Sequence, residues 1–253
     1  VVGLVNIQFV IYDDKVYVIE VNPRSSRTIP YISKVTGVPI IELATRCMLG
    51  ERLKDLGYGT GLYPSAKHVA VKMPVFSFEK LTDVDTGLGP EMKSTGEVLG
   101  IDTSFPQALL KAFLGSGMKI PRRSDNVVIT VKDEDKGEIV PIAKKFEELG
   151  VNIYATAGTA KVLKEAGVFV RPVSRIGEPG VNILDMITGG MVDLVINTPT
   201  KGKGHQTDGF RIRRAAVERS IPCITALDTA WAMLTVKTKG DKHELTPIDI
   251  SEI

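Results

Sequence analysis

A short stretch near the start of the chain places metal-binding and phosphate-binding side chains at alternate positions. Residues 16–22, VYVIEVN, alternate in the manner of a β-strand, so Glu20 and Asn22 project from one face and Arg24 follows two residues later. A carboxylate and an amide oxygen are hard ligands that suit Mg²⁺ or Mn²⁺. A guanidinium close to them suits a phosphate group. The pattern therefore predicts half of a metal–phosphate site.

A third candidate ligand, Gln8, lies in the preceding apolar run, residues 4–12. If residues 13–15 form a three-residue turn, strand pairing places Gln8 directly opposite Glu20. A two-residue turn would instead place Gln8 on the other face of the hairpin. The metal hypothesis therefore depends on the register, and a solvated strand end is the alternative explanation for these residue types.

The composition is that of an ordinary globular protein. The 253 residues are 43% apolar, which is enough for two modest cores, and the net charge of +2 indicates neither a nucleic-acid partner nor a membrane surface. No apolar run approaches the roughly 20 residues of a membrane span, and no signal peptide is evident. Cys47 and Cys223 lie in apolar contexts, which favours free thiols and a reducing, cytoplasmic setting. The chain opens without Met, so we expect it to be a piece of something longer.

Several elements are expected between the hairpin and a linker. Residues 40–48 have helical apolar spacing, residues 64–78 contain a strand, and residues 104–114 are predicted to form a helix by the same criterion. Residues 89–100 are polar and rich in turn formers, and residues 115–121 have the composition of a linker.

Beyond the linker, apolar strands alternate with amphipathic helices. The predicted strands are residues 127–131, 151–155, 168–173, 194–196 and 223–227. The predicted helices are residues 138–149, 160–166, 183–187, 209–220 and 229–234. Five βα units of these lengths predict an α/β fold with a Rossmann-like parallel sheet covered on both faces. We therefore expect two domains, residues 1–118 and residues 119–253.

Hydroxyl and amide side chains gather at the ends of three predicted strands. They are Thr130, Thr156, Thr159, Asn197, Thr198 and Thr200, with Lys136, Lys201 and Lys203 nearby. Ligands of open parallel sheets bind beyond the carboxyl ends of the strands. Threonine hydroxyls, helix N-termini and lysines at that edge predict a phosphate cradle. Neither a G-x-G-x-x-G fingerprint nor a P-loop is present, so a dinucleotide or NTPase site is disfavoured.

The basic run Arg211, Arg213 and Arg214 has two interpretations. On a helix Arg211 and Arg214 share a face, so one of them could reach the phosphate. The interpretation we favour is a solvated helix surface paired with acids such as Glu218. The three histidines have no partners at metal-ligand spacing and are interpreted as incidental.

The string VNIQF, followed by YVIEVNPRSSRTIPYISKVTGVP, resembles the end of the second ATP-grasp domain of the carbamoyl phosphate synthetase large chain. The resemblance implies that Gln8, Glu20 and Asn22 hold divalent metals and that Arg24 contacts the phosphate of ATP. The lysine and adenine pocket of such a domain are implied to lie upstream, so this piece alone is expected to be inactive. KMPVFSF and GPEMKSTGEVLG match as well. In some members the acid matching Glu97 contributes to an ornithine-type activator site, and a surface loop glutamate is the alternative.

Residues 123–234 resemble the methylglyoxal-synthase-like domain that closes the same large chain, most specifically in TAGTA, INTPTKG and DGFRIRRAAVERSIP. The resemblance implies a regulatory domain that binds a nucleoside monophosphate such as UMP or IMP. The residues implied to bind it are Thr130, Lys136, Thr156, Thr159, Arg175, Asn197, Thr198 and Thr200. An ornithine-responsive member has tyrosine where this chain has Cys223, although Thr225 is retained, so uridylate inhibition is favoured over ornithine activation.

Together the resemblances predict the C-terminal portion of a cytoplasmic enzyme of pyrimidine and arginine biosynthesis. The enzyme would make carbamoyl phosphate from ATP, bicarbonate and glutamine-derived ammonia. Its expected partners are the rest of the large chain, a glutaminase small subunit and a nucleotide effector, with self-association through the C-terminal domain. Two alternatives stay open. One is a phosphate-binding lyase of the methylglyoxal synthase type, for which Asp208 and His205 lie near the cradle. The other is a pure oligomerisation module.

Overall fold

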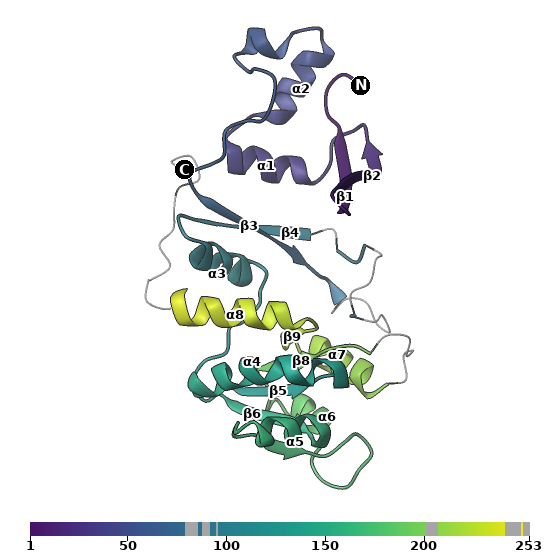
Figure 1. Ribbon diagram of the computed structural model, residues 1–253, viewed down its shortest axis with the longest axis vertical. Helices are drawn as coiled ribbons and strands as arrows, with labels where there is room; N and C mark the ends of the chain where they lie inside the picture. The colour runs from purple at the N-terminus through teal and green to yellow at the C-terminus, as the bar shows by residue number, and fades with distance from the viewer. Residues whose placement is uncertain (79–85, 88–91, 95, 201–206, 241–248, 250–253) are drawn as a thin grey trace.

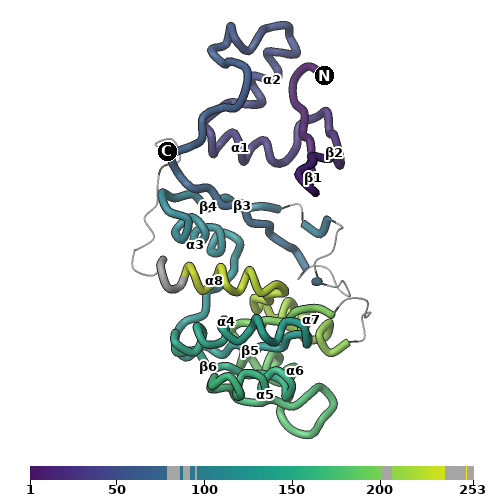
Figure 2. The backbone as a smooth tube through the Cα atoms, viewed as in Figure 1, coloured from purple at the N-terminus to yellow at the C-terminus, as the bar shows by residue number. Residues whose placement is uncertain are grey.

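The computed structural model describes residues 1–78, 86–87, 92–94, 96–200, 207–240 and 249. Figure 1 shows these residues as three units that follow one another along the long axis of the molecule. The first is a hairpin with two helices, the second a pair of strands with one helix, and the third a larger sheet with helices on both faces. Figure 2 traces the same path and shows that α8 runs alongside α3, far earlier in the chain.

The N-terminal unit is a β-hairpin followed by short helices. Its elements are β1 (Asn6–Tyr12), β2 (Lys15–Asn22), α1 (Thr28–Thr36), α2 (Ile40–Met48) and the 3₁₀ turn η1 (Leu53–Leu56). The bounds of α2 are those predicted from its apolar spacing. Both faces of the hairpin expose large apolar side chains, so its β-branched residues satisfy strand propensity without forming a core.

The hairpin turn has two residues and not the three on which the pairing of Gln8 with Glu20 was expected to depend. Both turn residues have positive φ values, 51° and 55°, as the commonest two-residue hairpin turns require. Gln8 nevertheless lies opposite Glu20, because a β-bulge follows within the ladder. Phe9 pairs with Val18 and Gln8 pairs with Glu20, so Ile19 is the extra residue. The bulge shifts the register by the one residue that the longer turn would have supplied.

The middle unit pairs β3 (Val69–Val75) antiparallel with β4 (Gly96–Asp102), and α3 (Phe105–Gly115) packs on both strands. The prediction of a turn-rich segment over residues 89–100 was wrong for β4. A glycine at position 100 is unfavourable in a strand pattern, but the packing of α3 on β4 requires glycine there. A Cβ on Gly100 would lie 2.0 Å from the carbonyl oxygen of Ala108, so only glycine lets α3 approach this closely.

The C-terminal unit is a five-stranded parallel sheet in the order β7-β6-β5-β8-β9. Its strands are β5 (Asn126–Thr130), β6 (Asn152–Thr156), β7 (Arg171–Val173), β8 (Leu194–Asn197) and β9 (Cys223–Ile224). Its helices are η3 (Asp133–Asp135), α4 (Lys136–Glu148), α5 (Ala157–Glu165), α6 (Ile183–Thr188), α7 (Asp208–Glu218) and α8 (Leu227–Gly240). The predicted Rossmann-like α/β fold is confirmed. The last strand is shorter than expected because α8 begins at Leu227, which the prediction assigned to the strand.

Alternation along the central strands explains why both faces of this sheet are covered. Val127 and Ile129 of β5 belong to one buried cluster, while Val128 between them belongs to another. Helices α4, α5 and α8 cover the first cluster, and α6 and α7 cover the second. Strands buried on both faces are typical of parallel sheets.

Helix α3 joins the middle unit to the C-terminal sheet. Leu109 and Phe113 of α3 lie in the same buried cluster as Met233 of α8. The division into residues 1–118 and residues 119–253 stays a prediction. Helix α3 lies on the N-terminal side of this predicted boundary and nevertheless shares a core with the C-terminal sheet.

Candidate functional site

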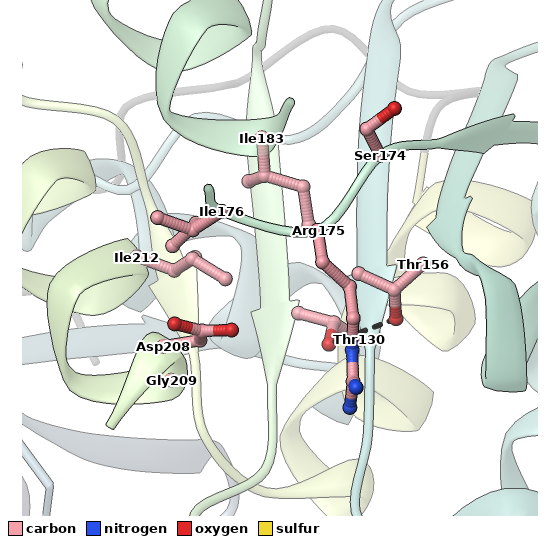
Figure 3. A pocket seen from close by; sticks show the side chains of 9 residues that line it. All are labelled: Thr130, Thr156, Ser174, Arg175, Ile176, Ile183, Asp208, Gly209 and Ile212. Carbon is pink, nitrogen blue, oxygen red and sulfur yellow. Dashed lines mark hydrogen bonds between the residues drawn. The ribbon is translucent and has the colours of Figure 1, made fainter. Parts of the chain in front are cut away.

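Two adjoining cavities open where β5 and β6 end. The larger has a volume of about 480 Å³, within the usual range for small-molecule sites, and Lys136, Gly158 and Thr159 line it. Thr130, Thr156 and Arg175 line both cavities, so the two are parts of one cleft. Figure 3 shows the smaller cavity, with the side chain of Arg175 reaching toward the two threonines.

The first turn of α5 supplies backbone donors to the larger cavity. Thr156 is the residue before α5, and its side chain makes no capping hydrogen bond to the helix. Helix N-termini carry unsatisfied N–H groups and a partial positive charge, which favours anions. A Cβ on Gly158 would lie 3.1 Å from Nζ of Lys136, so the lysine ammonium sits over this turn. Thr159 is 2% exposed and lines the same wall.

Lys136 pairs with Asp133 across the first residues of η3 and α4. The hydrogen bond from Lys136 holds the pKa of Asp133 below its usual value. The hydroxyl oxygens of Thr130 and Thr156 lie 3.4 Å apart beside this pair. A phosphate in the cavity would compete with Asp133 for the lysine, and it would find two hydroxyls already close together.

Asn197 and Thr198 are buried and hold strand ends together. The Asn197 amide donates to the carbonyl oxygen of Thr130 at 3.3 Å, and the Thr198 hydroxyl accepts from the backbone N–H of Lys132 at 3.0 Å. Thr200 is exposed and is not among the residues that line either cavity. The roles of Asn197, Thr198 and Thr200 as direct ligands stay predictions. In this structure Asn197 and Thr198 position the end of β5. Lys201, Lys203 and His205 lie outside the described residues.

The smaller cavity, of about 90 Å³, combines apolar and polar side chains and carries one carboxylate. Ile176, Ile183 and Ile212 line it together with Asp208 and Gly209. Sequence reasoning missed the three isoleucines, because each lies where an apolar residue is normally assigned to a core. Their shared position in one cavity appears only when α6 packs against α7 and α7 packs against β8.

The interpretation of the basic run as a solvated helix surface was wrong for two of its members. Arg213 and Arg214 are 4% and 8% exposed. Arg214 does pair with Glu218, at 2.8 Å between Nε and Oε1, as expected. Arg213 Nη1 donates to Oδ1 of Asn197 at 2.7 Å, a support to the strand end that the sequence analysis did not find. Arg213 directly follows Ile212, which lies on the apolar face of the helix, and this is the one signal in the sequence that indicated burial of Arg213.

Cys223 lies close to the same arginine but is not suited to nucleophilic chemistry. Burial raises the pKa of the Cys223 thiol to about 12, although the charge of Arg213 acts in the opposite direction. The thiol is therefore protonated at neutral pH, and the thiolate is the reactive form. The residue fills space beside β8 and is not a candidate catalyst.

The metal motif on the hairpin is exposed, in contrast to the strand-end cavity. Gln8 and Glu20 are opposite each other and solvent-exposed, and the Asn22 amide nitrogen donates to the Glu20 carboxylate. Arg24 donates to the carbonyl oxygen of Ser25 at 3.1 Å. One carboxylate with two amide oxygens fits a share of a Mg²⁺ or Mn²⁺ site, provided that the Asn22 amide rotates to present its oxygen. In the described part of the chain, no cluster of three or more His, Cys, Asp or Glu side chains could hold a metal.

Glu97 lies on β4 and not on a surface loop. Its carboxylate pairs with Nζ of Lys72 on β3 at 2.7 Å. The neighbouring Tyr31 has a raised pKa, mainly because of burial and in part because of the charge of Glu97. A cationic activator at Glu97 would therefore have to displace Lys72.

None of the helices in the described residues is both long and apolar enough to cross a membrane.

Comparison with known proteins identifies both parts of the chain. Residues 1–56 match the family described as carbamoyl-phosphate synthase L chain, ATP binding domain, and residues 138–225 match the MGS-like domain family. The chain is 54% identical, over all of its 253 residues, to the carbamoyl phosphate synthase large chain of Lachnoclostridium phytofermentans. It is 55% identical over 255 aligned positions to that of Agathobacter rectalis. The chain is a homologue of part of the carbamoyl phosphate synthase large chain.

The likeness covers only a share of those relatives. The chain spans about a quarter, 24%, of the length of the two curated relatives. Among solved structures, methylglyoxal synthase from Elizabethkingia anophelis NUHP1 is 22% identical. Its alignment covers 45% of this chain and 78% of that one, with a TM-score of 0.37.

Proposed function

We propose that this chain is the part of a carbamoyl phosphate synthase large chain that combines the end of its second ATP-grasp domain with a regulatory nucleotide domain. The cleft at the ends of β5 and β6 binds the effector, a nucleoside monophosphate such as UMP or IMP. The observation on which this proposal rests is that Lys136, Arg175 and the first turn of α5 line one cavity.

The larger cavity has the chemistry of a phosphate site. A monoester dianion there would meet the ammonium of Lys136, the guanidinium of Arg175 and the hydroxyl of Thr159. Hydrogen bonds in which one partner is ionised are about twice as strong as neutral ones. Backbone N–H groups at the start of α5 add donors that need no side-chain movement.

The smaller cavity has side chains that suit the edge of a nucleobase. The half-buried Ile176 offers apolar surface to a base, in front of the buried Ile183 and Ile212, and the Asp208 carboxylate accepts from N–H or O–H groups. A free phosphate would leave the smaller cavity unused, whereas a nucleoside monophosphate would place its phosphate and ribose in the larger cavity of about 480 Å³ and one edge of its base in the smaller cavity of about 90 Å³. The adjoining halves therefore support a nucleotide over inorganic phosphate.

The hairpin supplies part of the second site of the intact enzyme. There Gln8, Glu20 and Asn22 hold Mg²⁺ or Mn²⁺, and Arg24 contacts the phosphates of ATP. Such metals neutralise charge as a phosphoryl group moves to carbamate. The intact enzyme uses ATP, bicarbonate and ammonia released by a glutaminase subunit, in the cytoplasm, and this chain alone is inactive without the remaining ATP-grasp lobe. The effector changes activity through a coupling of about 1–3 kcal/mol.

Calorimetric titration of the 253-residue chain with UMP and IMP tests the proposal. We expect saturable binding that a Lys136→Ala, Thr159→Ala double variant loses. A Lys145→Ala variant is the matched control, because Lys145 lies on the same helix but pairs with Glu148. Absence of binding by a folded wild-type chain would refute the nucleotide assignment.

A lyase acting on a triose phosphate is a second candidate, because Asp208 lines the cavity beside Thr130 and Arg175. A carboxylate near a bound phosphate could remove a proton from dihydroxyacetone phosphate, and loss of phosphate would leave methylglyoxal. Incubation with dihydroxyacetone phosphate and measurement of methylglyoxal decides this. Turnover lost in an Asp208→Asn variant would support the lyase, and absence of turnover would exclude it.

A further inference from the structure

Helix α7 connects the nucleotide cleft to a second unit of the molecule. Asp208 and Gly209 in its first turn, and Ile212 one turn later, line the smaller cavity. The next two residues, Arg213 and Arg214, are both buried, yet their guanidinium groups bond to different elements. Successive residues of an α-helix point about 100° apart, because a turn contains 3.6 residues. Two adjacent arginines can therefore serve two neighbouring units.

Arg213 ties α7 to the strand ends. Its bond to Asn197, and the bond from Asn197 to the carbonyl oxygen of Thr130, form a chain from α7 through β8 to β5. Gly209 leaves the space that this chain needs. A Cβ there would lie 3.2 Å from Nη1 of Arg213 and 3.4 Å from Oδ1 of Asn197. The start of α7 and the phosphate-binding edge of the sheet are thus held as one body.

Arg214 ties the same helix to the segment that follows β3. Its Nη1 donates to the carbonyl oxygen of Phe78 at 3.1 Å, while its Nε donates to Glu218 at 2.8 Å. Phe78 is 8% exposed, and its ring stacks on Phe76 with centroids 5.0 Å apart and an angle of 6° between the planes. The bond therefore ends on a packed segment. Phe78 lies 136 residues before Arg214 in the chain, in the part that contains β3 and β4.

We propose that Arg214 is a positioning residue that couples occupancy of the nucleotide cleft to the β3–β4 unit. The inference rests on the proposed nucleotide function. A ligand that contacts the first turn of α7 restricts that helix, and the charge-assisted bond from Arg214 carries the restriction to Phe78. Coupling of this kind requires that the two ligation states differ in a shared structural element, and α7 is that element.

Hydrogen–deuterium exchange of the 253-residue chain, with and without saturating UMP, measures the coupling directly. In the wild type we expect UMP to slow exchange both at the strand ends and at residues 76–78, by about fivefold or more. In Arg214→Met, UMP should bind within about twofold of the wild-type affinity and still protect Thr156 and Thr159, but protection of residues 76–78 should be lost. Inorganic phosphate, as a second probe, should protect the larger cavity and transmit less to residues 76–78.

Two further variants keep the test independent of folding defects. Glu218→Gln removes the ion pair but leaves the bond from Arg214 to Phe78, so coupling should persist. Arg214→Lys keeps the charge, but its single ammonium stays with the Glu218 carboxylate and leaves the carbonyl of Phe78 without this donor, so the variant should lose coupling as Arg214→Met does, even if the methionine variant fails to fold. Calorimetry of each variant precedes the exchange experiment.

The outcomes separate the two proposals. If the wild type binds UMP but residues 76–78 do not respond, or respond equally in the Arg214 variants, the coupling role is overturned while the nucleotide site stands. If the folded wild type does not bind UMP, the proposed function fails and the coupling role fails with it.

Discussion

The hairpin and the strand-end cleft carry functional residues of similar types, but their surroundings are opposite. Gln8 and Glu20 lie on an exposed two-stranded ribbon, whereas Asn197 and Thr159 are almost completely buried. The hairpin residues contact near neighbours in the chain. The cleft residues are held by partners from other strands and helices.

The difference shows how much of a site one segment can supply. A strand places alternate residues on one face whatever its surroundings, so the hairpin presents its ligands without a core. A cleft at the end of a parallel sheet exists only after several crossovers have brought distant strand ends together. We therefore expect the cleft to be a formed binding site in this chain and the hairpin to be a component of one.

The largest effect should be on stability, because the cleft lies on a sheet with a hydrophobic core and the hairpin, within the described residues, has none. Phe113 is fully buried between α3 and the C-terminal sheet, and Phe113→Ala should cost about 3–5 kcal/mol of unfolding free energy. Phe9 on the hairpin is 55% exposed, so Phe9→Ala should cost far less. Urea unfolding followed by circular dichroism measures both. Similar losses for the two variants would contradict the contrast.

The next effect concerns ligands, and it should separate the two regions completely. Lys136→Ala should weaken UMP binding by about 1.5–3 kcal/mol, or roughly 10- to 150-fold, because a charge-assisted bond is lost. Glu20→Gln should leave UMP binding unchanged. Conversely, weak Mn²⁺ binding, measured by electron paramagnetic resonance, should depend on Glu20 and not on Lys136. An effect of either variant on the other ligand would show that the sites are coupled within this chain.

A smaller, pH-dependent effect is expected in the middle unit. Burial acts to raise the pKa of Asp102, but hydrogen bonds from Lys111 and the Thr103 backbone outweigh it, and the pKa lies below its usual value. A depressed carboxyl pKa stabilises the fold above the unfolded-state pKa, and this stabilisation is lost as the pH falls through the folded-state value. Asp102→Asn should cost about 1 kcal/mol at pH 7 and progressively less in acid.

The control for that measurement is an exposed ion pair. Asp55 pairs with Arg52 at 2.8 Å, but both side chains are more than half exposed. Asp55→Asn should therefore leave the unfolding free energy almost unchanged at both ends of the pH range, as measured by urea unfolding. A pH-independent loss in Asp102→Asn would mean that the carboxylate contributes through packing and not through its charge.

Prediction from sequence succeeded where local pattern and fold agree. The helix from Ile40 to Met48 and the parallel sheet followed from periodicity, because alternation and helical spacing report burial directly. It failed at β4, because Gly100 is needed for a close approach of α3 that no local pattern reveals. Burial of Arg213 and Arg214 was also missed, because arginine on a helix is normally solvated and their partners lie far away in the chain.

The sequence by itself determined which residues are able to do chemistry and on which elements they lie. Alternation placed Glu20 and Asn22 on a strand, and the strand–helix order brought Thr130, Thr156 and Lys136 to one edge of a sheet. Only the tertiary structure decided how those residues are used. The bulge restored the register of Gln8, and packing of α7 directed adjacent arginines to two different units. Register and burial depend on contacts between segments far apart in the chain, which local residue patterns do not encode.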